Sequence, residues 1–82
     1  MTDEEDMSME YVRKTYGVPA KRGRLVEVYY RFQGLWRLAV RDRITSASNC
    51  IYVGGVPVHP TDNVVYLADD NSVILDTRKD QR

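Results

Sequence analysis

Apolar and polar residues alternate along two neighbouring stretches of the chain, RLVEVYYRF (24–32) and LWRLAVRDRIT (35–45). Alternation with a period of two, in stretches rich in β-branched and aromatic residues, is typical of strands with one buried face. Gln33 and Gly34 separate the two stretches. Because a short connection that contains glycine joins antiparallel neighbours, the pattern predicts a β-hairpin.

The length of the hairpin loop decides which side chains share a face of the sheet. A two-residue loop pairs Tyr30 with Arg37 and sets a charge against the apolar face. A three-residue loop, from Gln33 to Leu35, pairs Tyr30 with Leu38 and makes every inward pair apolar. We therefore expect the longer loop. Its register places one aromatic and four basic side chains on the outer face: Tyr29, Arg31, Arg37, Arg41 and Arg43.

Four shorter apolar stretches follow the hairpin, separated by clusters of Gly, Pro, Ser, Asn and Asp that favour turns. They are CIYV (50–53), VPV (56–58), VVYL (64–67) and VILDT (73–77). Pro57 confines its stretch to a sheet edge because proline has no N–H for the ladder. Turns that recur about every 8 to 12 residues favour an all-β barrel or sandwich, and no stretch predicts a long amphipathic helix.

Both ends of the chain are expected to lie outside the folded domain. Residues 1–10 hold five acidic residues, no basic one and few apolar ones, a composition that favours a disordered acidic tail. Residues 11–77 would form one β domain, and residues 78–82 a frayed C-terminus. With 82 residues in all, the domain is too small to enclose a large cavity.

The formal net charge is zero, but the charges are segregated along the sequence. Residues 21–43 hold seven basic residues against two acidic ones, and arginine dominates. The planar guanidinium group suits phosphates, aromatic rings and acidic protein surfaces. We therefore expect a face that binds nucleic acid or an acidic protein surface, formed by Lys21, Arg22, Arg24, Tyr29, Arg31, Arg37, Arg41 and Arg43. Phe32 and Trp36, paired at the hairpin tip, are the expected protein-interface residues.

The segments KRGRLVEV, RDRITSASNCIYV, GG and VPVHPTDNVVYL follow one another in an order that resembles the small SH3-like barrels. The similarity covers residues 17–67 and is closest to the KOW-type barrel and to short phage or prophage proteins of that shape. VPAKRG and VHPTDNVVYL carry it most specifically. The resemblance implies an SH3-like barrel of about five short strands that binds a macromolecule and has no catalytic residues.

The sequence lacks the residue patterns that catalysis, metal binding and membrane insertion require. The single cysteine, Cys50, cannot form an intramolecular disulfide or a cysteine-based zinc site, and the single histidine, His59, gives no ligand cluster. The acidic N-terminus differs from a signal peptide, and no apolar run approaches the roughly 20 residues that cross a bilayer. We expect a non-enzymatic cytoplasmic protein without metal, cofactor, membrane contact or small-molecule substrate.

The leading hypothesis is a small binding module of phage or prophage type that contacts nucleic acid through the Arg/Tyr-rich hairpin face. The alternative is a protein interaction module, either a host-factor adaptor or inhibitor or a homo-oligomeric structural protein. It would use exposed aromatic residues and the sheet edge. A homodimer through the Pro57 edge or through the hairpin is open under this alternative.

Overall fold

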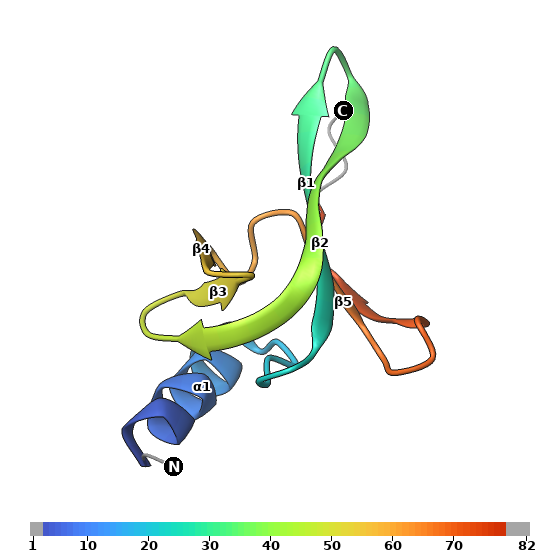
Figure 1. The fold of residues 1–82 in the computed structure, drawn as a ribbon. Helices are drawn as coiled ribbons and strands as arrows, with labels where there is room; N and C mark the ends of the chain where they lie inside the picture. The colour runs from blue at the N-terminus through green and yellow to red at the C-terminus, as the bar shows by residue number, and fades with distance from the viewer. Residues whose placement is uncertain (1–2, 79–82) are drawn as a thin grey trace.

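The computed structural model of the chain describes residues 3–78, and the side chains from residue 7 onward. Within this range it contains one helix followed by six strands (Figure 1). They are α1 (Asp3–Tyr16), β1 (Leu25–Phe32), β2 (Leu35–Ala47), β3 (Ile51–Val53), β4 (Val56–Val58), β5 (Val64–Leu67) and β6 (Val73–Asp76). The alternation predicted an all-β fold; the structure is mostly β, with the expected strands all present and one short helix in addition.

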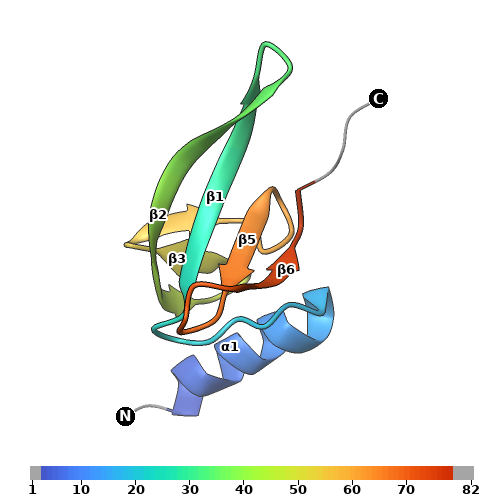
Figure 2. The ribbon, with the colours of Figure 1, turned by 90° about the vertical axis from the view of Figure 1, so that its right-hand side faces the viewer.

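The six strands form one open antiparallel sheet with the order β4-β3-β2-β1-β5-β6. β2 is 13 residues long and pairs with β1 along its first part and with β3 at its end. Figure 1 shows that β2 curves strongly between these two partners, while Figure 2 shows α1 lying across one end of the sheet. The core lies where the curved sheet and α1 meet, and its buried residues are Met9, Val12, Val18, Ala20, Val26, Ile44, Ile51, Val53, Val64 and Tyr66.

The N-terminal segment differs from the sequence-based expectation. Residues from Asp3 onward belong to α1, so the disordered tail expected over residues 1–10 is not confirmed, and the segment forms one short helix that the sequence pattern did not predict. Residues 1 and 2 lie outside the described residues. Met9 and Val12 recur at helical spacing and are buried, which explains why the segment orders. The helix ends before Gly17, whose φ of 66° is left-handed and whose N–H donates to the Arg13 carbonyl.

The loop of the hairpin formed by β1 and β2 has two residues. Gln33 and Gly34 have φ angles of 53° and 78°, the left-handed conformations of a type I′ turn. Tyr30 consequently lies opposite Arg37, the pairing that the apolar pattern argued against. The expected three-residue loop is therefore wrong.

A β-bulge restores the expected pairing nearer the core. Val28 lies opposite Val40, but the next residue, Tyr29, lies opposite Leu38. Ala39 is therefore an extra residue on β2, and it absorbs the one-residue difference between the two registers. The pairs that the longer loop predicted are present below this bulge and absent above it.

The outer part of this hairpin projects beyond the rest of the sheet. β5 accompanies β1 only as far as Val28, with one further hydrogen bond of 2.9 Å from the Tyr29 N–H to the Asn63 carbonyl. Beyond that point the two strands pair with each other, and Figures 1 and 2 both show them standing clear of the other elements. We call residues 30–38 the hairpin arm.

Two methionines of α1 provide a matched test of its packing. Met9 is 5% exposed and Met7 is 65% exposed. Met9→Ala should lower the free energy of unfolding by about 2 to 3 kcal/mol because it leaves a cavity in the core. Met7→Ala should change it by less than about 0.5 kcal/mol. Urea unfolding followed by circular dichroism measures both values, and equal effects of the two substitutions would contradict the packing of α1 on the sheet.

Candidate functional site

Cross-strand pairing sorts the side chains of the hairpin arm onto two faces. Residues directly opposite each other in an antiparallel pair point to the same side of the sheet, and successive residues alternate. Tyr30 lies opposite Arg37 and Phe32 opposite Leu35, so these four residues share one face. We call it the apolar arm face.

The apolar arm face is open to solvent. Tyr30, Phe32 and Leu35 keep 48%, 52% and 59% of their surface exposed. On the same side of β1, Val26 is buried and Val28 packs against the core. The apolar side chains on this side of β1 thus continue from the core into the arm. In the arm, the described residues cover only about half of each of these side chains.

On the other face of the arm, arginine side chains stack on aromatic rings. The guanidinium carbon of Arg31 lies 4.9 Å from the centre of the Trp36 ring. That of Arg78, which follows β6, lies 4.5 Å from the centre of the Tyr29 ring and 5.7 Å from that of Trp36. Cation–π contacts at exposed sites contribute about 0.5 to 1 kcal/mol each. We call Tyr29, Arg31, Trp36 and Arg78 the stacked face.

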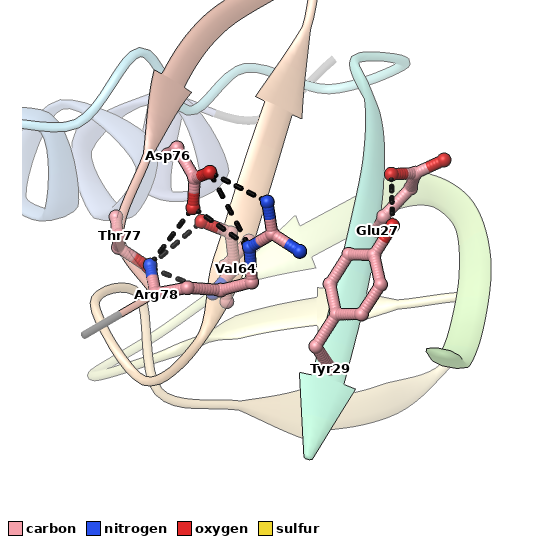
Figure 3. A network of polar contacts seen from close by, with 6 residues as sticks. All are labelled: Glu27, Tyr29, Val64, Asp76, Thr77 and Arg78. Carbon is pink, nitrogen blue, oxygen red and sulfur yellow. Dashed lines mark hydrogen bonds and ion pairs between the residues drawn. The ribbon is translucent and has the colours of Figure 1, made fainter. Parts of the chain in front are cut away.

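The preceding residues Asp76 and Thr77 fix the position of Arg78, as Figure 3 shows. Its guanidinium donates hydrogen bonds to both carboxylate oxygens of Asp76, at 3.0 and 2.8 Å. The Thr77 hydroxyl oxygen accepts the Val64 N–H at 2.7 Å, and the Thr77 N–H donates to the Val64 carbonyl at 2.9 Å. The hydrogen bond from Arg78 lowers the pKa of Asp76 and raises the pKa of Arg78, which keeps both groups charged at neutral pH.

Glu27 lies at the base of the arm and makes two polar contacts. Its carboxylate accepts the Tyr29 hydroxyl at 2.7 Å (Figure 3) and the Arg41 Nε–H at 3.0 Å. The hydrogen bond to Glu27 raises the pKa of Tyr29, so the hydroxyl stays protonated at neutral pH. The charge of Arg41 is thus paired within the chain.

The structure brings together only part of the predicted basic face. Arg41 and Arg43 lie on the same side of the hairpin as Arg31, as expected. The bulge and the two-residue loop move Arg37 to the apolar arm face, opposite Tyr30. The expectation that four arginines share one face is therefore wrong for Arg37.

The basic residues at the base of the hairpin point in different directions. Lys21 and Arg22 are exposed in the turn before β1. Arg24 is partly buried and donates from Nη1 to the Leu67 carbonyl at 3.0 Å. Arg43 donates to a backbone carbonyl of the turn before β1 at 2.9 Å. These contacts direct two of the expected binding side chains toward the body of the protein.

Other arm residues depart from the sequence-based interpretation. Phe32 and Trp36, expected as a pair at the hairpin tip, lie on opposite faces of the arm. Leu38 and Tyr30, expected in the core, are both half-exposed. Arg78 was assigned to a frayed C-terminus, although an acidic residue two positions before it was a local signal for an ion pair. The remainder of that expected frayed segment, residues 79–82, lies outside the described residues.

The described residues 3–78 contain no group of three or more His, Cys, Asp or Glu side chains that could hold a metal ion. The Nδ1 of His59 lies 3.2 Å from the backbone nitrogen of Thr61, and its ring meets the Tyr16 ring edge-on with centres 5.1 Å apart. Cys50 is partly exposed. Over the same part of the chain, no helix is long and apolar enough to cross a membrane.

No family model, curated protein or solved structure matches this chain. The resemblance to KOW-type barrels and the phage or prophage origin therefore stay predictions, as do the binding roles of the candidate residues.

The contact between Arg78 and Asp76 can be tested by titration. Arg78→Gln removes the charged donor, so the pKa of Asp76 should rise toward its ordinary value of 3.8. A carboxylate with a lowered pKa contributes stability above its unfolded-state pKa, and the wild-type protein should lose this contribution as the pH falls through the lowered value. Carbon-detected NMR of the Asp76 carboxyl group measures the midpoint in both proteins.

Asp70 is the internal control for this titration. Hydrogen bonds from Ser72 lower its pKa, and it should titrate identically in the wild-type and Arg78→Gln proteins. If the Asp76 midpoint does not move either, the contact with Arg78 is absent in solution.

Proposed function

We propose that this chain is a non-enzymatic protein-binding module that contacts its partner with the hairpin arm. The observation that carries the proposal is the apolar arm face, on which three large apolar side chains remain about half exposed. Exposed apolar patches bordered by polar residues mark interaction sites on soluble proteins. Aromatic side chains such as Tyr30 and Phe32 are also the kind of anchor that contributes most to interface energies.

The charge of the arm defines the chemistry of the partner. Residues 30–38 contain two arginines, Arg31 and Arg37, and no acidic residue. Complementary charges across an interface favour specific association and speed up the encounter. The partner surface is therefore apolar with an acidic border.

Nucleic acid is the second candidate partner, and the side-chain contacts support it less well. Nucleic-acid binding requires arginines for phosphates and open aromatic rings for bases. Arg41 already pairs with Glu27, and Arg78 with Asp76. The ring of Tyr29 is covered by Arg78. Phosphates and bases would compete with these internal contacts on the stacked face. The apolar arm face has open rings but a single arginine, Arg37, for phosphates, and it offers three exposed apolar side chains to a protein.

An SH3-like barrel is the architecture that we propose for the body of the module. The order β4-β3-β2-β1-β5, in which the long β2 pairs with both β1 and β3, supports this assignment because one curved strand serves two parts of the sheet. β6 and α1 would be additions to such a barrel. In this arrangement the barrel orients the hairpin arm, and the arm contacts the partner protein.

Site-specific crosslinking tests the proposal. A photoreactive residue in place of Phe32 should capture a defined protein from a lysate of the source cells. The same probe in place of Val73, which is 60% exposed on β6, is the matched control and should capture far less. Adding Leu35→Ser to the Phe32 probe protein should reduce capture several-fold because it removes a second apolar contact.

Two results would speak against a protein partner. Capture that disappears after nuclease treatment and falls steeply with salt would support nucleic acid instead. Equal capture from both positions, or none from Phe32, would mean that the arm is not the contact surface.

A further inference from the structure

The outer side of α1 presents a second apolar surface. Met7 and Tyr11 are four residues apart, so they share one side of the helix, and both are exposed. With Ser8, Ser48 and Asn49 they line an open hollow of about 300 Å³. This volume is at the lower limit of binding pockets, about 300 to 1,000 Å³, and suits one or two inserted side chains. We call this surface the helix hollow.

α1 and the hairpin arm have opposite net charges. The sequence of α1 (Asp3–Tyr16) contains five acidic and two basic residues. The hairpin arm, residues 30–38, contains two arginines and no acidic residue. Glu10 pairs with Lys14 at 3.0 Å, an exposed helix-surface contact that adds little stability and can give way to an incoming arginine. An apolar hollow on a helix of net negative charge is thus present on the chain itself.

The arm cannot reach the helix hollow of its own chain. Figures 1 and 2 place the arm and α1 at opposite ends of a molecule whose longest dimension is 43 Å. Two complementary surfaces that cannot meet within one chain can meet between copies. We infer that the partner of the hairpin arm is a second copy of this chain, whose helix hollow receives side chains of the apolar arm face. This inference rests on the proposed function.

The size of the contact favours a reciprocal dimer. A fully buried aromatic side chain removes about 150 to 250 Å² from water, and those of the arm are already half covered. One arm on one hollow therefore buries less than the roughly 1,200 to 2,000 Å² of a stable interface. Two antiparallel copies form the contact twice, once at each end, and approach that range. The expected species is a dimer with two-fold symmetry.

Sedimentation velocity of the full chain tests the inference. Over roughly 5 to 500 µM it should show a monomer–dimer equilibrium, and raising NaCl from about 50 to 500 mM should weaken it. Phe32→Ser and Tyr11→Ser should each weaken dimerisation at least tenfold, because each removes an anchor from both contacts. Val73→Ser, a similarly exposed position on β6, is the matched control and should leave the equilibrium unchanged.

Mixing the two variants identifies which surfaces meet. The Phe32→Ser protein keeps an intact hollow, and the Tyr11→Ser protein keeps an intact arm. A mixture should therefore form heterodimers with one intact contact, above the level that either variant reaches alone. A contact between two arms predicts instead that Tyr11→Ser dimerises like the wild type. Thermal unfolding checks that both variants are folded, and Leu35→Ser and Met7→Ser replace any variant that is not.

The outcomes separate this inference from the proposed function. A dimer that is insensitive to the arm and hollow substitutions, or weakened by Val73→Ser alone, overturns the inference. So does a chain that stays monomeric over the whole concentration range. If that monomer still captures another protein from the Phe32 probe, the proposed function stands without the inference. A monomer that captures nothing contradicts both.

Discussion

A single extra residue in the pairing of β1 with β2 determines which surfaces the molecule presents. Below Ala39 the hairpin follows the register that turns apolar side chains of both strands inward, and above it the side chains of β2 exchange faces. With a three-residue loop and no bulge, Trp36 would share a face with Phe32, and Arg37 would share one with Arg31. The arm would then have an aromatic face and a basic face. With the bulge, each face carries both aromatic and basic side chains.

The two faces of the arm have different roles in its stability. A two-stranded ribbon is at best marginally stable in water by itself. Here the hydrogen bonds of Thr77 hold the end of β6 against β5, and Arg78 reaches from there onto Tyr29 and Trp36. These contacts lie on the stacked face and brace the base of the arm. The side chains of the apolar arm face stay about half exposed, which leaves them available for intermolecular contacts.

The strands could be predicted from the sequence because alternation and turn residues are local signals. The helix was missed because the acidic composition of residues 1–10 outweighed Met9 and Val12 at helical spacing and Gly17 as a stop. Their burial depends on a surface that distant strands supply. The bulge at Ala39 was missed because a three-residue loop without a bulge turns the same apolar residues inward near the core. The contacts of Arg78 with the hairpin join distant segments, so no local pattern indicates them.

Trp36 is the only tryptophan of the chain, and two guanidinium groups lie near its ring. The emission of an indole depends on the charges and the water around it. The arm therefore contains an intrinsic optical probe at the point where its two strands and the C-terminal segment meet. A ligand that binds at this point and displaces Arg31 or Arg78, or that excludes water from the ring, changes the wavelength or the quantum yield of the emission. The residues that brace the arm thus also make occupancy of the stacked face visible by fluorescence without a label.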